Sequence, residues 1–331
     1  MAGDSGKFFR NITLSCVFGG MLEFSTDRVC DVAIVGAGPA GLAAAVYLTR
    51  FQRSVLVFDA GDARAKLIPK TFNCPGFPEG ISGEDLLSRL RDQAKAYGAD
   101  IVQTGVEDVG GAEGAFNLGT AAGGIKASRV VLATGIVDRA PNIAGLREAI
   151  LAGTVRLCPV CDAYEAAGKR IAVAGPECLA LKEAMFLRDY SPNVWILSNH
   201  PEDLSETTRM KAAGAGIEIW DAVDDLVPRG SGYDVVMGDG SPTRQIDVVY
   251  PSMGCDVRSE LAASLGADCD ENGYVLAGPH LETSVPGLYA IGDVAKALNQ
   301  IAVGFGHAAL AASHIHNVLR ERTSTKRMRA A

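Results

Sequence analysis

The chain has 331 residues, of which 48% are hydrophobic and 21% charged, with a formal net charge of −8 and a pI of about 5.2. This length allows two domains, each with its own core. The acidity argues against nucleic acid or an anionic membrane as a partner, and no apolar run reaches the ~18 residues of a membrane span. The eight cysteines are scattered rather than spaced like a secreted disulfide framework, so we expect a reducing, cytoplasmic location.

Residues 1–27 are expected to form a loose N-terminal extension. Lys7 and Arg10 precede an apolar stretch at residues 12–18, an order that faintly resembles a signal peptide. Glu23 follows that stretch, and no small-residue cleavage site stands out. We therefore favour an extension upstream of a true start at Met21 over an export signal.

A dinucleotide-binding loop follows a buried strand at residues 32–35. The loop reads GAGPAG at residues 36–41, and an apolar helix opens at Leu42. This order of strand, loop and helix places a pyrophosphate against the free N–H groups at the helix N-terminus. A second strand at residues 54–59 ends in an acid that can hold a ribose hydroxyl. The alternative is a tight turn without a ligand. The predicted contacts are Gly36, Gly38, Pro39, Ala40, Gly41 and Asp59.

Cys158 and Cys161 form a C-x-x-C pair with Asp162 directly behind it. Two cysteines three residues apart at a helix start face the same way and can close a small disulfide, and the helix N-terminus lowers the pKa of a thiol. Exchange between a dithiol and a flavin moves protons as well as electrons, and Asp162 is placed to transfer them. The alternatives are half of a zinc site, for which no second C-x-x-C exists, and a pair of unreactive core cysteines.

A second strand–loop–helix unit begins at residues 169–174, but its loop lacks phosphate-binding features. Pro176 follows Gly175 and has no N–H to donate, and Glu177 puts a side chain and a negative charge where the second glycine should be. The next strand ends in Ser198-Asn199-His200, which offers neither an acid for a ribose nor an arginine pair for a 2′-phosphate. We therefore expect a retained scaffold, or a site for another ligand, rather than tight binding of NADPH or NADH.

Near the C-terminus, a strand at residues 287–294 contains Gly292-Asp293 and precedes a long apolar helix at residues 298–319. A carboxylate at this strand end can hold the ribityl and phosphate region of a flavin. Together with the first loop and the turn Ala133-Thr134-Gly135, this indicates FAD rather than NAD at the first site. His307 either lies near the flavin ring or is a helix histidine whose hydrogen bonds are satisfied within the protein.

These pieces together resemble the low-molecular-weight thioredoxin reductases over about residues 28–320. The matching segments are GAGPAGLAAA, NCPGFPEGISGEDL, ATG, CPVCD and GLYAIGDV, in family order. The resemblance implies that Cys161 is the thiol next to the flavin, that Cys158 attacks the partner, and that Asp162 is the proton-transfer acid. It also implies a homodimer and a domain rotation that exposes the dithiol alternately to the flavin and to a thioredoxin-like protein or small disulfide. The further FAD contacts that it implies are Asn73, Val106, Thr134, Gly135, Gly292, Asp293, Gln300 and Ile301.

The chain departs from this family where NADPH would bind. The second loop reads AGPECLA instead of a glycine-rich sequence, Ser198-Asn199-His200 replaces a basic motif, and Gln300-Ile301-Ala302 stands where the family usually has Arg-Gln-Ala. These replacements resemble an atypical branch that does not use pyridine nucleotides. That branch includes ferredoxin-dependent and deeply rooted reductases, and dithiol oxidases that use oxygen. The oxidases typically carry a histidine after C-x-x-C, where this chain has Asp162.

We therefore predict an α/β fold of two Rossmann-like three-layer ββα domains, the second inserted into the first. The FAD-binding domain is expected at residues 28–143 and 268–322, the dithiol domain at 144–267, and a flexible tail at 323–331. Crossovers are expected near Pro141-Asn142 and Gly266-Ala267.

The predicted function is an FAD-dependent disulfide oxidoreductase that passes electrons through Cys158 and Cys161 to a thioredoxin-like protein disulfide. The electron donor is unknown; a ferredoxin is one candidate, and NADPH is disfavoured. The alternatives are an ordinary NADPH-dependent thioredoxin reductase, a flavin-dependent dithiol oxidase that uses oxygen, and a non-enzymatic flavin-bound redox sensor.

Overall fold

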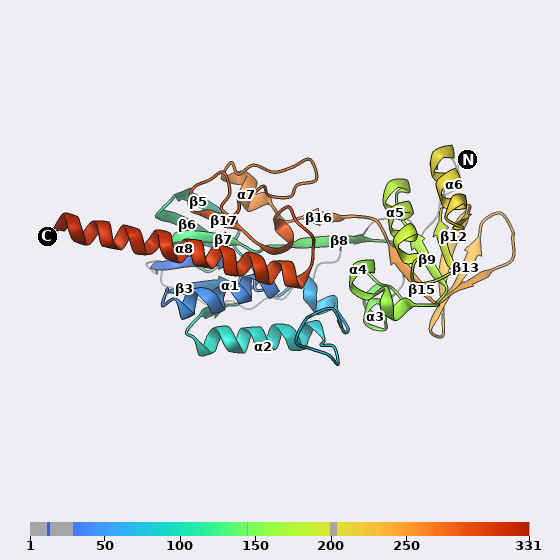
Figure 1. Ribbon diagram of the computed structural model, residues 1–331, viewed down its shortest axis with the longest axis horizontal. Coiled ribbons are helices and arrows are strands. Elements are labelled where there is room, and N and C mark those ends of the chain that lie inside the picture. The colour runs from blue at the N-terminus through green and yellow to red at the C-terminus, as the bar shows by residue number, and fades with distance from the viewer. Residues whose placement is uncertain (1–11, 14–28, 144, 199–203, 331) are drawn as a thin grey trace.

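The computed structural model describes residues 12–13, 29–143, 145–198 and 204–330. Figure 1 shows two lobes, each built from sheets and helices, joined by the strands β8 (Ile136–Ala140) and β16 (Cys255–Val257). We call residues 29–135 and 258–330 the first lobe, and the described residues between 141 and 254 the second lobe. The second lobe is an insertion in the first, and the predicted α/β class with two Rossmann-like units is confirmed.

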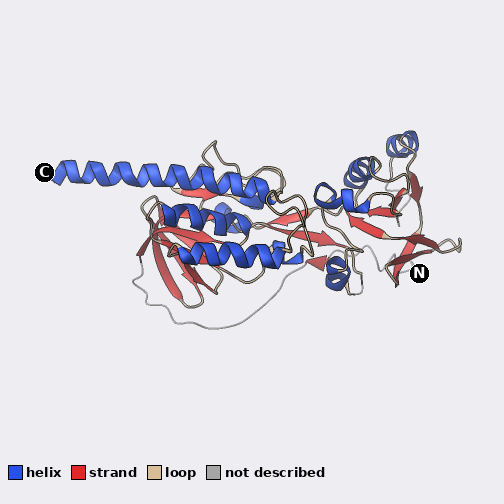
Figure 2. Ribbon diagram, turned by 60° about the horizontal axis from the view of Figure 1, so that its bottom comes forward, coloured by secondary structure: helices blue, strands red, loops and turns tan. Residues whose placement is uncertain are grey.

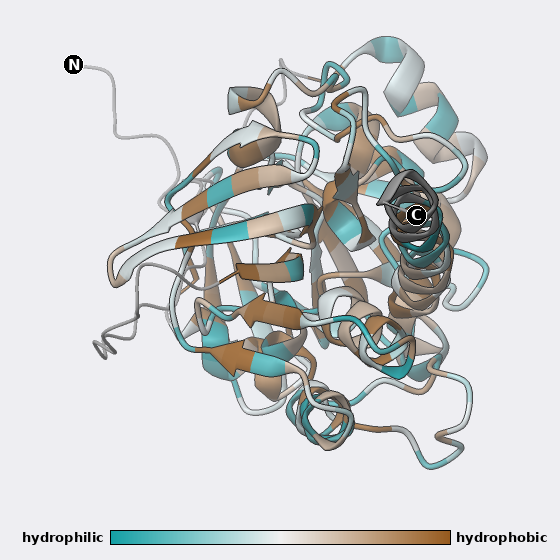
Figure 3. Cartoon of the chain, turned by 90° about the vertical axis from the view of Figure 1, so that its left-hand side faces the viewer, coloured by the Kyte–Doolittle hydropathy of each residue, from teal (hydrophilic) through white to brown (hydrophobic). Residues whose placement is uncertain are grey.

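The first lobe contains a seven-stranded sheet in the order β4-β3-β2-β7-β6-β5, with β17 also pairing with β7. The central strand β2 runs parallel to β3 and β7, whereas β5, β6 and β7 form an antiparallel meander. Both faces of β2 are buried, since Val32 and Ile34 belong to one core cluster and Ala33 and Val35 to another. Figure 3 shows brown, hydrophobic strands in the middle of the molecule, with helices beside them. The strands are β2 (Val29–Val35), β3 (Val55–Phe58), β4 (Asp100–Val102), β5 (Asp108–Ala112), β6 (Ala115–Thr120), β7 (Gly123–Leu132) and β17 (Leu288–Ala290).

Three long helices, α1 (Pro39–Arg50), α2 (Gly83–Ala96) and α8 (Ile301–Ala330), cover one face of this sheet (Figure 2). α8 continues to Ala330 through the residues predicted to be a flexible tail; residues 320–330 contain neither Gly nor Pro, so no helix breaker ends it earlier. Among the described residues, no helix is both long and apolar enough to cross a membrane. Short helical turns occur at η2 (Arg64–Leu67) and η5 (Gly292–Val294).

The second lobe contains a parallel sheet in the order β11-β10-β9-β15. Helices α5 and α6 cover one face, and the antiparallel sheet β12-β13-β14 covers the other. Side chains of β15 alternate, so that Val248 and Tyr250 join the core beneath α5 and Val249 joins the opposite core. The strands are β9 (Ile171–Ala174), β10 (Val194–Leu197), β11 (Glu218–Trp220), β12 (Val223–Arg229), β13 (Gly232–Met237), β14 (Arg244–Ile246) and β15 (Val248–Pro251). The helices are α3 (Leu146–Leu151), α4 (Pro159–Asp162), η3 (Tyr164–Ala166), α5 (Glu177–Leu187) and α6 (Glu206–Gly214).

The two lobes are connected by antiparallel pairing of β8 with β16, in which Asp138 lies opposite Cys255. β8 ends at Ala140, next to the predicted crossover at Pro141-Asn142. After β16, the helix α7 (Glu260–Ser264) places Ala262 in the core of the first lobe. We therefore propose that the chain returns to the first lobe at β16, upstream of the predicted crossover at Gly266-Ala267. The sequence could not indicate this, because a helix as short as α7 carries no signal for the lobe on which it packs.

Most of the predicted N-terminal extension lies outside the described residues. Its described part is β1 (Ile12–Thr13), which pairs antiparallel with β8.

Candidate active site at the junction of the two lobes

A cavity of about 690 Å³ lies at the junction of the lobes and reaches from the first glycine loop to the cysteine pair. Its lining combines the loop after β2, the 59–73 segment, the start of α8 and the region around α4. Every residue predicted to act in catalysis or cofactor binding lines it except Gly41. Those that line it are Cys158, Cys161, Asp162, Gly36, Gly38, Pro39, Ala40, Asp59, Asn73, Val106, Thr134, Gly135, Gly292, Asp293, Gln300 and Ile301.

The glycines of the first loop have separate geometric roles. Gly36 has φ +112°, and a Cβ there would lie 2.3 Å from the carbonyl oxygen of Ala133. A Cβ on Gly41 would lie 2.0 Å from the Gly36 carbonyl oxygen, so this glycine serves close packing of helix and loop. A Cβ on Gly38, in contrast, would meet no protein atom within 4 Å. The space beside Gly38 and the N-terminus of α1 is therefore open to a pyrophosphate.

Asp59, at the end of β3, is bound by the protein's own donors. Its Oδ2 accepts hydrogen bonds from Arg91 Nη2 at 2.7 Å and Gln103 Nε2 at 2.8 Å, and its Oδ1 accepts one from the Gly61 N–H at 2.9 Å. Burial would raise the pKa of Asp59, but these donors outweigh it and hold the pKa below its usual value. The carboxylate is thus ionised and fixed at the cavity wall, and its contact with a ribose stays a prediction.

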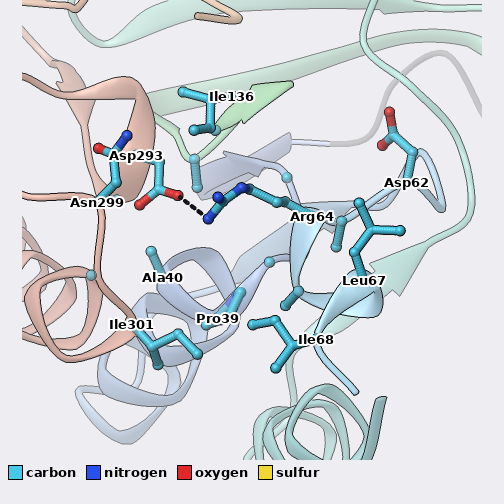
Figure 4. A pocket seen from close by; sticks show the side chains of 18 of the residues that line it. Pro39, Ala40, Asp62, Arg64, Leu67, Ile68, Ile136, Asp293, Asn299 and Ile301 are labelled. Atoms are coloured by element: carbon cyan, nitrogen blue, oxygen red, sulfur yellow. Dashed lines mark ion pairs between the residues drawn. The ribbon is translucent and has the colours of Figure 1, made fainter. Parts of the chain in front are cut away.

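Asp293 faces an arginine that the sequence did not single out. Figure 4 shows the Arg64 side chain pointing toward Asp293, with Nη1 3.8 Å from Oδ2. Arg64 also makes a bidentate pair with Asp138 of β8, with distances of 2.7 and 2.8 Å. Burial raises the pKa of Asp293, and Arg64 opposes this rise. A hydrogen bond to α8 holds the Gly292-Asp293 turn in place, since the Gly292 N–H donates to His307 Nδ1 at 3.2 Å. His307 is therefore a satisfied helix histidine that positions this turn.

Cys158 and Cys161 form a disulfide, as expected for the C-x-x-C pair. Cys158 is the N-cap of α4, but α4 is a single turn, so its dipole is weaker than that of a longer helix. The Gln300 side chain, just before α8, places Nε2 3.5 Å from Cys158 Sγ and 3.4 Å from Cys161 Sγ. Gln300 is itself held by Asn73, whose Nδ2 donates to Oε1 at 3.0 Å. An amide of the first lobe therefore faces both sulfurs of the second.

Asp162 is held by two groups of its own lobe. The hydroxyl of Tyr250 donates to Oδ1 at 2.8 Å, and Arg156 Nη1 donates to the Asp162 carbonyl oxygen at 2.6 Å. Burial raises the pKa of Asp162 to about 6, although the Tyr250 hydrogen bond and the charge of Arg156 act in the opposite direction. A carboxyl group with a pKa near 6 exchanges protons readily at neutral pH.

The loop of the second strand–loop–helix unit does not line this cavity, because residues 175–180 are not among the lining residues. Pro176 is the N-cap of α5 and makes no side-chain cap. Glu177 accepts hydrogen bonds from the N–H of Ser205 at 2.8 Å and from its hydroxyl, and these lower the pKa of Glu177. Ser205 is the N-cap of α6, so Glu177 links the starts of the two helices. Asn199 and His200, at the end of the next strand, lie outside the described residues.

Several side chains at this site escaped sequence reasoning because no motif contains them. Arg64, Arg91 and Gln103 read as ordinary polar residues of connecting segments, and Tyr250 reads as part of a buried strand. No local signal would have revealed them, since each contacts its partner across at least 32 positions of sequence. Among the described residues, no group of three or more His, Cys, Asp or Glu side chains could hold a metal ion.

Comparison with known proteins gives a consistent picture. The model of the family described as pyridine nucleotide-disulphide oxidoreductase matches residues 30–313. A bifunctional thioredoxin reductase/thioredoxin from Mycobacterium leprae is 30% identical over 313 residues, covering 91% of this chain and 68% of the relative. The crystal structure of HlmI superposes with a TM-score of 0.85 at 26% identity, covering 94% of this chain and 98% of that one. The atypical thioredoxin reductase TRi from Desulfovibrio vulgaris Hildenborough is 29% identical, with a TM-score of 0.50 and coverage of 88% and 98%.

Proposed function

The chain belongs to the pyridine nucleotide-disulphide oxidoreductase family, and within it we propose a thioredoxin reductase-like enzyme whose flavin takes electrons from a donor other than NADPH. At the level of the family, the chain is an FAD flavoprotein disulfide oxidoreductase, and Cys158 and Cys161 form its disulfide. The proposal adds the exclusion of NADPH, a thioredoxin-like or small disulfide as substrate, and a role for each site residue. We also infer a homodimer from the family resemblance and a cytoplasmic location from the scattered cysteines.

The residues around the cavity fit FAD. The open space beside Gly38 and the N-terminus of α1 suits the pyrophosphate, and Asp293 at η5 suits the ribityl hydroxyls. Val106 also lines the cavity, and we place the adenine beside it. The residues that we place around the isoalloxazine end, beside the disulfide, are Asn73, Thr134, Gly135, Gln300 and Ile301.

Bound FAD supplies the two-electron carrier between the donor and the disulfide. Two electrons break the Cys158–Cys161 bond and leave two thiolates, and Asp162 donates a proton to one of them. The Cys158 thiolate then attacks the partner disulfide, and one partner sulfur leaves. Cys161 returns its proton to Asp162 and attacks Cys158 in the resulting mixed disulfide, which re-forms the Cys158–Cys161 bond and releases the second partner sulfur as a thiolate; the two partner thiolates take up protons from solvent.

The exclusion of NADPH is supported by one observation: Glu177 is the first residue of α5, and its carboxylate is hydrogen-bonded to Ser205 at the start of α6. A helix N-terminus attracts an anion, and here the chain supplies its own carboxylate. A nucleotide diphosphate would have to break the hydrogen bonds to Ser205 and tolerate a second negative charge nearby. Pro176, the preceding residue, also has no N–H with which to bind a phosphate.

The proposed direction of electron flow is tested by single turnover without a nicotinamide. Enzyme reduced anaerobically with dithionite, and then freed of excess reagent, should reduce a thioredoxin disulfide in a ratio of about two disulfides per flavin, because the flavin and the Cys158–Cys161 pair each store two electrons. The Cys158→Ser variant, which keeps the cavity but lacks the attacking thiol, is the matched control and should transfer no electrons. A reduced native enzyme that leaves every disulfide substrate intact would contradict the proposal.

A further inference from the structure

We infer that Tyr250 is a positioning residue that holds one oxygen of Asp162 and thereby directs the other toward the cysteine pair. The inference deepens the proposed function, because it rests on Asp162 as the proton-transfer acid. The Tyr250 hydroxyl donates to Asp162 Oδ1 at 2.8 Å across 88 positions of sequence. No motif contains Tyr250, and its contact becomes visible only when β15 and α4 are brought together.

The aromatic ring of Tyr250 is fixed by the core of the second lobe. Tyr250 is completely buried, and it belongs to the same cluster as Ala163, directly behind Asp162, and Leu181 of α5. A buried tyrosine hydroxyl needs a hydrogen-bond partner, and the Asp162 carboxylate accepts its hydrogen bond, with Arg156 also close to the hydroxyl. The hydroxyl therefore has little freedom, and Asp162 Oδ1 is anchored to the parallel sheet.

The second carboxylate oxygen of Asp162 remains available. The nearest cation, Arg156 Nη1, lies 3.9 Å from Oδ2, because that nitrogen donates instead to the Asp162 carbonyl oxygen at 2.6 Å. Among the described residues, no donor lies within hydrogen-bonding distance of Oδ2. Asp162 and both cysteines line the same cavity. This arrangement separates the two oxygens into one that is held and one that exchanges a proton.

Tyr250 neither gives up nor accepts a proton in this step. When two electrons break the disulfide, protonated Asp162 gives its proton from Oδ2 to one thiolate and becomes a carboxylate. Tyr250 keeps its own proton throughout, because burial and the neighbouring carboxylate raise the pKa of Tyr250 far above its usual value. Its hydrogen bond stabilises the carboxylate that remains after transfer.

The charged groups around Asp162 set the direction of the expected effect. Its pKa of about 6 is the net result of burial, the largest effect, and of Glu165, which raise the pKa, and of Tyr250, Arg156 and Lys169, which lower it. Removing the Tyr250 hydroxyl deletes a stabilising donor and leaves the other groups in place. The pKa of Asp162 should therefore rise in a Tyr250→Phe variant.

The test is the pH dependence of disulfide reduction by dithiothreitol, followed by alkylation and mass analysis of Cys158 and Cys161, which does not depend on flavin turnover. We call the part of this pH–rate profile that follows the protonation of Asp162 the Asp162 limb. In Tyr250→Phe, this limb should move up by about one pH unit, which is a tenfold change in the protonation of Asp162 at fixed pH. The matched control is Tyr233→Phe, which removes the hydroxyl of another buried tyrosine in the same lobe, one that faces Thr154 at 3.5 Å. This control should leave the limb in place.

Two further variants separate the inference from the proposed function. Asp162→Asn should abolish the limb, and Asp162→Asn combined with Tyr250→Phe should behave like Asp162→Asn alone. If Asp162→Asn removes the limb while Tyr250→Phe leaves it at the native pH, the positioning role of Tyr250 is wrong and the proposed function stands. If Asp162→Asn leaves the limb intact, Asp162 is not the acid, and both the assignment and the inference fail.

Discussion

Glu177, the first residue of α5, accepts hydrogen bonds from both the N–H and the hydroxyl of Ser205, the N-cap of α6, so that an acidic side chain stands in the first turn of α5. The corresponding helix of the first lobe, α1, begins beside Gly38, where space is open and no acidic side chain stands in the first turn. Two units of the same topology therefore differ at the position where a phosphate would bind. This contrast is the basis for assigning a nucleotide cofactor to the first lobe and none to the second.

Opening the second loop should create weak nicotinamide binding. In a Pro176→Gly, Glu177→Gly double variant, the loop gains an N–H and loses a negative charge, so affinity for NADPH should increase at least about tenfold over the native chain. Isothermal titration calorimetry measures this change. The matched control is Glu206→Gly, which removes an acid from the first turn of α6 while leaving Glu177 bound to Ser205. Equal affinity in the native and double-variant proteins would show that the loop does not limit binding.

The two cysteines should behave differently toward a partner disulfide. Cys161→Ser leaves the Cys158 thiol free to attack but removes the thiol that resolves the mixed disulfide, so a covalent complex with a thioredoxin-like protein should accumulate. Cys158→Ser should trap nothing. Cys178→Ser, which replaces an exposed cysteine outside the pair, should react like the native enzyme. Non-reducing gel electrophoresis reads the outcome, and trapping by the Cys158→Ser variant instead would reverse the assigned roles.

Gln300 should keep the reduced cysteines reactive. Its Nε2 faces both sulfurs, and an N–H donor stabilises a thiolate, so Gln300→Leu should remove this stabilisation and slow alkylation of the reduced cysteines at pH 7 by about threefold or more. The neighbouring Asn299→Leu variant is the control, because Asn299 donates to the Tyr274 hydroxyl rather than to a sulfur. Iodoacetamide kinetics on the reduced protein measure the effect. An unchanged rate in Gln300→Leu would mean that the amide contributes nothing to thiolate stability.

The Arg91–Asp59 pair should contribute to stability in a pH-dependent way. The folded-state pKa of Asp59 is depressed, so its contribution is present above the unfolded pKa of about 3.9 and is lost as pH falls through the folded value. Arg91→Met should therefore lower the free energy of unfolding by about 1–3 kcal/mol at pH 7, and by less in acid. Urea denaturation across this pH range measures the difference.

The control for that prediction is the exposed pair of Arg139 with Asp256, in which Arg139→Met should change stability by less than about 1 kcal/mol. If Arg91→Met and Arg139→Met lowered the free energy of unfolding equally at pH 7, burial of Asp59 would not explain the contribution of the Arg91–Asp59 pair to stability.

The sequence predicted those features that depend on neighbouring residues. The glycine loop, the cysteine pair and the proline and glutamate of the second loop are local patterns, and their backbone geometry follows from a few adjacent residues. The contacts that organise the site are long-range. Arg64 meets Asp138 across 74 positions, and Gln300 meets Cys158 across 142. Such pairs are set by the packing of the two lobes, which no periodicity in the chain encodes.

The position of the second crossover shows the same limit. The sequence prediction places this crossover near Gly266-Ala267. In the structure, β16 has already paired with β8, and α7 contributes Ala262 to the core of the first lobe. A helix as short as α7 has too few residues for its apolar face to indicate which sheet it covers.

Anaerobic titration of the flavin-loaded enzyme with NADPH tests the central claim most directly, with dithionite and reduced ferredoxin as parallel additions. Flavin absorbance at about 450 nm should stay essentially unchanged with a stoichiometric excess of NADPH or NADH, while dithionite bleaches it fully. Rapid bleaching by NADPH would show that the loop at Pro176 and Glu177 admits a nicotinamide after all, and the enzyme would then be an ordinary NADPH-dependent reductase.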